Sequence, residues 1–135
     1  GLADAFAVDP LVVRLAFAGE ADLDLYVTDS AYETVYFGNS PSATGGELLA
    51  DLRCDAPAPR VETVVFARRR RGVVRVGVDA PERCQKGVRL VPFVVELRAG
   101  ERRVLQRGVA VPGRFEVIVL EIEVDGAGPA LRDGT

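Results

Sequence analysis

Hydrophobic and polar residues alternate along much of this chain with a period of two residues. In residues 11–17 a large apolar residue takes every second position, and in residues 22–27 Leu23, Leu25 and Val27 do the same. Successive side chains of a β-strand point to opposite faces of the sheet. The alternation therefore predicts strands with one buried face.

Runs rich in Val, Ile, Leu and aromatic residues predict more strands along the rest of the chain. They cover residues 34–37, 47–52, 61–66, 73–78, 88–98, 102–111 and 115–124. Glycine and proline cluster between these runs and indicate turns, while Pro92, inside one run, indicates an edge position or a bulge. We predict an all-β fold: an antiparallel β-sandwich that is jelly-roll-like and has about eight strands.

The length of 135 residues fits a single domain. We expect an N-terminal arm or extra strand in residues 1–9, the sandwich in residues 10–125 and a flexible C-terminal tail in residues 126–135. Residues 5–8 include Phe6 and Val8 and can form a strand that pairs with the sheet edge of a neighbouring molecule.

Composition argues against several classes of function. Hydrophobic residues make up 48% of the chain, and the net charge of −3 does not favour nucleic-acid binding. The chain has no His, which excludes Ser-His-Asp and Cys-His catalysis and any His metal ligand. Two Cys cannot form a four-thiolate zinc site, and dinucleotide and Walker motifs are missing. No apolar run approaches the ~20 residues of a transmembrane segment. We expect a protein that is not an enzyme.

One segment resembles a known family signature. The sequence DLDLYVTD, from Asp22 to Asp29, resembles the DLDLhVtDP signature of the YfaP-like bacterial domains of unknown function. The sequence VYFGN at residues 35–39 resembles that family's vyYGN, and Ser42, Gly45-Gly46 and Asp51 follow its S.sGG.LdvD pattern. The similarity covers residues 11–124. Thr63 departs from the family's usual Asn, and residues 68–71 replace a Pro-rich turn.

The resemblance implies a fold and a location more than an activity. Members are typically exported bacterial proteins, or domains of larger secreted and surface proteins, and their chemistry is uncharacterised. This chain is therefore expected to be periplasmic, cell-surface or extracellular. Cys54 and Cys84 fall at the positions of the two family cysteines.

Two interpretations of Cys54 and Cys84 remain open. Their spacing is unlike a CxxC redox motif, which leaves a disulfide between two loops or a pair of free buried thiols. In an exported protein, a disulfide closing a loop of this length stabilises the fold by roughly 3–4 kcal/mol.

Asp22 and Asp24 are the first candidate ligand-binding residues. Residues i and i+2 of a strand share a face, with Cα atoms ~6.5–7 Å apart, so two carboxylates can bind one hard cation. Asn39 and Asp51 can add oxygen ligands, and calcium tolerates such irregular sites. The alternative is that both aspartates face solvent or cap turns. A glycosidase carboxylate pair has no further support in the chain.

The run Arg68, Arg69, Arg70 and Arg71 is the second candidate. It can contact an anionic ligand or an acidic partner, or it can be a solvated loop that ends in a turn at Gly72. The aromatic residues Tyr26, Tyr32, Tyr36 and Phe37 are close in sequence, and we expect them to pack at the core or its rim rather than to form a carbohydrate platform.

Two functions follow from these patterns. The first is a non-catalytic extracellular or cell-surface structural or adhesion module that acts through protein–protein contacts, including a subunit of a surface assembly. The second is a calcium- or anion-binding module of an exported protein. The sandwich pattern, the missing catalytic groups and the family resemblance favour the first.

Overall fold

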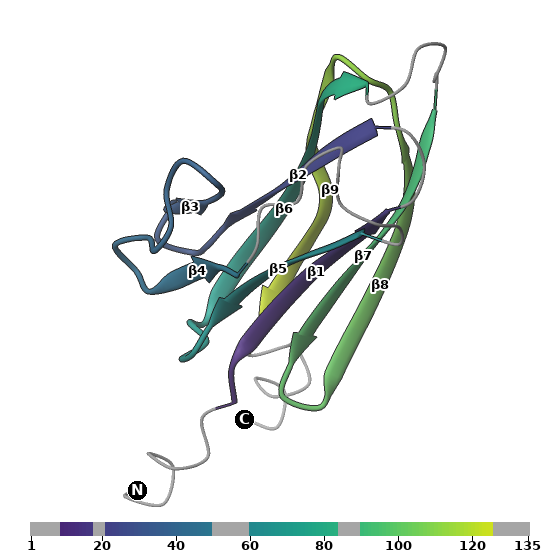
Figure 1. The fold of residues 1–135 in the computed structure, drawn as a ribbon. Coiled ribbons are helices and arrows are strands. Elements are labelled where there is room, and N and C mark those ends of the chain that lie inside the picture. The colour runs from purple at the N-terminus through teal and green to yellow at the C-terminus, as the bar shows by residue number, and fades with distance from the viewer. Residues whose placement is uncertain (1–8, 18–20, 50–59, 84–89, 126–135) are drawn as a thin grey trace, which may run out of the picture.

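The computed structural model describes residues 9–17, 21–49, 60–83 and 90–125. In these ranges the chain forms nine strands, arranged as two antiparallel sheets packed face to face (Figure 1). The predicted all-β antiparallel sandwich is confirmed. None of the described residues forms a helix long and apolar enough to cross a membrane.

One sheet has five strands in the order β4-β5-β1-β7-β8, and the other has four in the order β3-β2-β6-β9. The chain passes repeatedly from one sheet to the other, as between β1 and β2, β5 and β6, and β8 and β9. The strands are β1 (Leu11–Phe17), β2 (Ala21–Thr28), β3 (Thr34–Val35), β4 (Gly46–Leu48), β5 (Arg60–Phe66), β6 (Gly72–Arg83), β7 (Val91–Ala99), β8 (Arg102–Ala110) and β9 (Arg114–Val124).

The core lies between the two sheets, where the period-two pattern placed it. On β1 the inward residues from Leu11 to Phe17 are buried and alternate with more exposed ones, and β5 and β7 repeat the alternation on either side. On β2, Leu23, Leu25 and Val27 are at most 1% exposed. These apolar side chains are the main source of stability, because burial of apolar surface is the dominant favourable term in folding.

Three strands differ from the sequence expectation. β3 is limited to two residues because the chain turns after Val35, and Tyr36 and Asn39 close the turn through an isolated bridge. β4 begins at Gly46 and ends at Leu48. β6 extends to Arg83 because it pairs with β2 on one side as far as Ala21.

Pro92 was expected on an edge strand or at a bulge, yet β7 is an interior strand between β1 and β8. The pairing of β1 with β7 ends at Phe93, so Pro92 pairs only with Val109 of β8. Among the described residues Pro92 therefore has a strand partner on one side, a position in which a residue without an N–H donor is tolerated.

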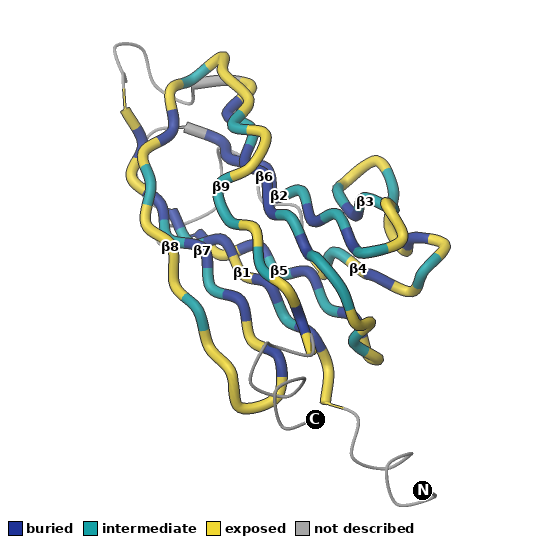
Figure 2. Tube along the Cα trace, turned by 180° about the vertical axis from the view of Figure 1, so that it is seen from behind, coloured by how far each residue is buried: buried dark blue, intermediate teal, exposed yellow. Residues whose placement is uncertain are grey.

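β8 and β9 are the outer strands on the same side of the sandwich. β8 pairs only with β7, and β9 pairs only with β6, within the part of the chain that the structure describes. Figure 2 shows both as mostly exposed along their lengths, unlike the interior strands. Among the described strands, two long edges therefore remain open.

Candidate functional site

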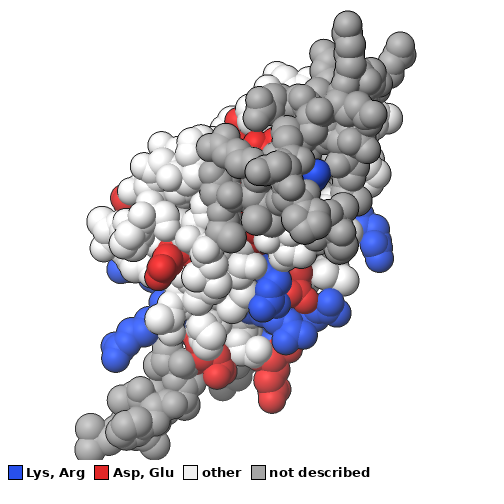
Figure 3. Space-filling model, viewed as in Figure 1, with Lys and Arg blue, Asp and Glu red and all other residues white. Residues whose placement is uncertain are grey.

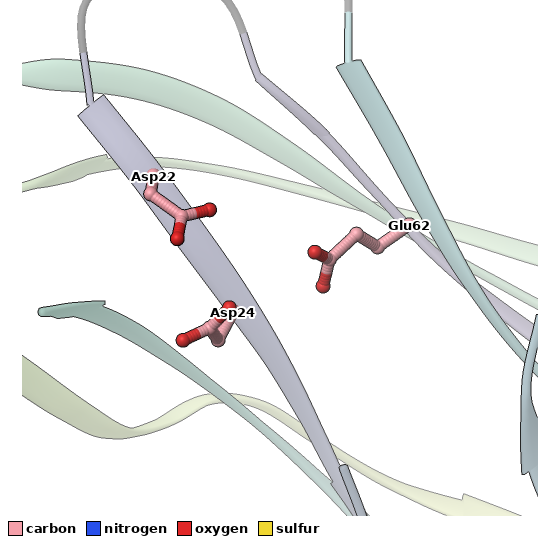
Figure 4. A group of neighbouring side chains, drawn as sticks. All are labelled: Asp22, Asp24 and Glu62. Carbon is pink, nitrogen blue, oxygen red and sulfur yellow. The ribbon is translucent and has the colours of Figure 1, made fainter. Parts of the chain in front are cut away.

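Three carboxylates meet between the sheets. Asp22 and Asp24 lie on β2 of the four-stranded sheet, and Glu62 reaches toward them from β5 of the five-stranded sheet (Figure 4). One oxygen of each lies within 4.8 Å of the others, and the three residues are at most 4% exposed. We refer to Asp22, Asp24 and Glu62 as the acidic cluster.

The free edge of β2 explains how these side chains meet. β3 pairs only with Val27 and Thr28, so it does not cover the part of β2 that contains Leu25. There the backbone N–H of Leu25 donates to Oε1 of Glu62 at 3.1 Å, in place of a strand partner. Glu62 of the acidic cluster therefore accepts a hydrogen bond from an edge N–H group of β2 at the junction of the two sheets.

The pairing of β2 with β6 is irregular beside the acidic cluster. On the other side of β2 the pairing with β6 shifts between Asp22 and Asp24, which face Glu82 and Asp79 respectively. Such irregularities re-aim side chains at the ends of sheets. The pairing advances two residues along β2 and three along β6, so the extra residue lies on β6.

The structure thus brings together only part of the predicted cation site. The alternative was that Asp22 and Asp24 face solvent or cap turns, and its first part is wrong because both residues are buried. Asn39 lies elsewhere: its Nδ2 donates to the carbonyl of Thr34, which pairs with Thr28. Thr28 is four residues from Asp24, about 13 Å along the strand. Asp51 lies outside the described residues.

Glu62 was not predicted as a site residue, although the residue pattern of β5 indicates that it faces inward. Val64 and Phe66 define the buried face of β5, and Glu62 falls on the same face by strand periodicity. Arg60 shares that face, is buried and lies with its guanidinium carbon 5.9 Å from the ring centre of Phe17. Charged residues at inward positions of a strand are the pattern that predicts a buried polar site.

The acidic cluster influences nearby titration. The pKa of Tyr26 is raised, first by burial and then by the negative charges of Asp79 and Asp24. Burial also raises the pKa of Asp79, while a hydrogen bond from the backbone of Ala80 acts in the opposite direction. This end of the four-stranded sheet is therefore electronegative and partly shielded from water.

Several residues of the family-like motif organise a loop instead of a ligand site. Asp29 is buried and accepts hydrogen bonds from the backbone N–H groups of Ala31, at 2.8 Å, and Glu33, at 3.1 Å. Asn39 donates to Glu33 Oε1 at 3.0 Å, and Ser42 Oγ accepts from the N–H of Gly46 at 2.9 Å. Asp and Ser side chains stabilise turns in this way.

The arginine run is partly engaged in ion pairs. Arg69 contacts the carboxylates of Asp125 and Asp9, and Arg71 donates to the carbonyl oxygen of Asp125 at 2.9 Å. These contacts tie the β5–β6 turn to the start of β1 and the end of β9. Arg68 and Arg70 are exposed. Two of the four guanidinium groups proposed for an anionic ligand therefore have a structural role.

The aromatic residues pack as a cluster on the outer face of the four-stranded sheet. The rings of Tyr26 and Tyr36 stack with centroids 4.9 Å apart, and Phe115 of β9 lies 4.7 Å from Tyr26 on another strand. Phe37 contacts both tyrosines edge-on, whereas Tyr32 stands apart and is exposed. The expected rim packing is confirmed for Tyr26, Tyr36 and Phe37, and Phe115 joins them.

A second surface feature follows the open edges. Six exposed large apolar residues come from the segment that contains the end of β8, the connecting turn and the start of β9. They are Leu105, Val109, Val111, Phe115, Val117 and Ile118. A concentration of exposed apolar side chains of this kind is typical of an interaction site.

Basic side chains gather on the outer face of the five-stranded sheet, over β1, β7 and β8 (Figure 3). Glu96 on β7 holds three of them: Arg14 at 3.0 Å, Arg103 at 2.6 Å and Arg98 at 3.5 Å. The hydrogen bond from Arg103, followed by that from Arg14, lowers the pKa of Glu96. Positive charge remains in excess on this face.

Cys54 and Cys84 lie outside the described residues, so the structure leaves both interpretations of this pair as predictions. No protein-family model, curated protein or solved structure matches the chain. The resemblance to the YfaP-like domains consequently stays a prediction from the motif residues.

Proposed function

We propose that this protein is a non-catalytic structural or adhesion module that acts through protein–protein contacts, as a self-associating subunit of a surface assembly. The observation that carries the proposal is the side of the sandwich formed by β8 and β9. There two long strand edges stay open, and exposed apolar residues such as Leu105 and Val117 lie along them.

A long, exposed edge strand with apolar side chains is a liability in a monomer, because its N–H and C=O groups are a template for another strand. Natural proteins usually block such edges with charges, proline or a covering loop. β8 and β9 also carry charged residues, but β9 presents Val117, which is 71% exposed, and Ile118 beside it. Adding a strand from another molecule satisfies the backbone groups and covers the apolar side chains at the same time.

A non-catalytic role and an exported location complete the proposal. The complete lack of His removes the commonest general base, and the burial of the acidic cluster keeps a substrate away from its carboxylates. The resemblance to exported bacterial domains supports a periplasmic, cell-surface or extracellular location.

Sedimentation velocity of the full chain over a range of concentrations tests the proposal. We expect the wild type to associate, and Leu105→Lys on β8 combined with Val117→Lys on β9 to abolish association. Leu49→Lys is the matched control, because Leu49 is also an exposed apolar residue but lies after β4. A wild type that stays monomeric, or association that survives the double substitution, would overturn the proposal.

A second candidate function is calcium binding at the acidic cluster. The observation that favours it is the convergence of three buried carboxylates from two sheets on one point. Carboxylate oxygens are the ligands that calcium prefers, and backbone carbonyls or water can complete its 6–8 ligands. Concentrated negative charge in a buried region also favours a bound cation.

Thermal unfolding in calcium and in EDTA tests this candidate. A site filled at 100 times its Kd stabilises the native state by about 2.7 kcal/mol, which raises Tm on the order of 10 °C. Asp24→Asn should reduce the shift, whereas the control Asp79→Asn, on the neighbouring strand, should keep it. An identical Tm in millimolar calcium and in EDTA would exclude calcium.

A further inference from the structure

The outer edge of β8 carries a regular pattern of charge and apolarity. Val104 pairs with the buried Leu97, so Val104 faces inward and its neighbours face outward. Strand periodicity then puts four residues on the outer face in a row: Arg103, Leu105, Arg107 and Val109. Cationic and apolar side chains thus alternate along an open edge.

The two arginines differ in their partners. Arg103 is bound to Glu96 at 2.6 Å. Arg107 makes no ion pair with any residue that the structure describes, and its side chain lines a surface hollow of about 370 Å³ together with Ala16, Pro92 and Val94. A ligand for this edge therefore needs one negative charge at Arg107 and apolar groups beside it.

The sequence of residues 2–8 has the complementary pattern. Large residues occupy every second position, as Leu2, Asp4, Phe6 and Val8, and alanine fills the three positions between them. We propose that residues 2–8 of a second copy of this chain pair as an antiparallel strand with the outer edge of β8. This inference rests on the proposed function, for which it names the partner and the register.

One register matches both patterns. It places Phe6 opposite Leu105, Asp4 opposite Arg107 and Leu2 opposite Val109. Directly opposed residues of antiparallel strands have Cβ atoms about 4.5–5.5 Å apart, close enough for apolar contact and an ion pair. Val8 then lies opposite Arg103, whose guanidinium already contacts Glu96.

Other registers lose the match. A shift of two residues in either direction places Asp4 opposite Leu105 or Val109, and Arg107 then faces Leu2 or Phe6. A shift of one residue turns the large side chains to the inner side of β8. That side faces toward β9 (Figure 2), so the small alanines fit it better.

The geometry of Asp9 favours a second copy over the same molecule. Asp9 is held by Arg69 and lies beside Gly100 of the β7–β8 turn. Three Cα–Cα steps lead from Asp9 to Phe6 and span at most about 11 Å. The position opposite Leu105 is about 10 Å to the side of β7 and about 10 Å along it, roughly 14 Å in all. Exchange between copies is a head-to-tail contact, which builds a ring where the rotation between subunits closes and an open chain where it does not.

Charge reversal in the full chain tests the register. Arg107→Glu and Asp4→Arg should each weaken association at least about tenfold, because like charges then face each other. The double variant should regain most of the wild-type association. Arg70→Glu is the control, since it reverses the charge of an exposed arginine away from β8. An unchanged Tm for each variant verifies folding.

Mixing two blocked chains gives a second readout. A chain with Phe6→Lys keeps only its β8 edge, and a chain with Leu105→Lys keeps only its N-terminal strand. The two blocked elements cannot pair with each other, because two positive charges would then face each other. A mixture of the two chains should form 1:1 dimers and no longer polymers. Association that needs Leu105 or Val117 but ignores Asp4, Phe6 and Arg107 would overturn this register and leave the proposed function standing. A monomeric wild type would overturn both.

Discussion

Glu62 on β5 accepts a hydrogen bond from the backbone N–H of Leu25 on β2, at 3.1 Å across the junction of the two sheets. The carboxylate takes the place of a strand neighbour that β3 is too short to supply. This contact joins the sheets at the point where Asp22 and Asp24 also lie.

Removing this acceptor should destabilise the fold. Glu62→Ala leaves the buried N–H of Leu25 without its partner, which costs about 1–3 kcal/mol. Glu62→Gln keeps an oxygen at the same place and should cost less. Urea unfolding of both variants measures the difference. Equal losses for Ala and Gln would show that the charge of Glu62, and not the hydrogen bond, determines stability.

Stability in acid should depend on Glu96. Its pKa is lowered by Arg103 and Arg14, so the ionised form is favoured in the native state. This contribution is present above the ordinary glutamate value of 4.5 and is lost as the pH falls below it through the lowered pKa. Glu96→Gln should flatten the loss of stability in that range, whereas Glu47→Gln, at an exposed position, should not.

Asp79 should change the stability of the fold with pH in the direction opposite to that of Glu96. Burial raises its pKa, so the native state binds its proton more tightly than the unfolded chain does. Its ionisation then lowers stability as the pH rises above the ordinary value of 3.8. Asp79→Asn should raise Tm at pH 7 and leave it unchanged near pH 3. A lower Tm at pH 7 would contradict this account.

Gly46 should tolerate no side chain. A Cβ at this position would overlap the side chains of Val35 and Phe66, both of which are buried in the core. Gly46→Ala should therefore cost about 1–3 kcal/mol through overpacking. The neighbouring exposed residue gives the control, because Glu47→Ala changes no core contact. Chemical denaturation measures both variants.

Alternation predicted most of the fold because it depends on local sequence alone. The buried positions of β1, β5 and β7 follow from which residues share a face. The short β3 was harder to predict, since Tyr36 and Phe37 have strong strand propensity but follow the turn that Asn39 closes. Local propensity does not determine where a neighbouring strand ends.

The candidate sites depend on contacts between distant parts of the chain. The burial of Asp22 and Asp24 requires that β5 lie beside an uncovered edge of β2, and Glu62 is 37 residues away from the N–H that it accepts. The partners of Arg69 are likewise remote, at Asp9 and Asp125. Periodicity gives the face of each side chain, whereas the packing of the two sheets determines which faces meet.

The most direct test of the central claim is the sedimentation velocity of the wild type beside the Leu105→Lys, Val117→Lys double variant. The account predicts that the sedimentation coefficient of the wild type rises with protein concentration. The double variant should stay at the value of a monomer throughout. Identical behaviour of the two proteins, monomeric or associated, would contradict the claim that the open β8–β9 side is an assembly surface.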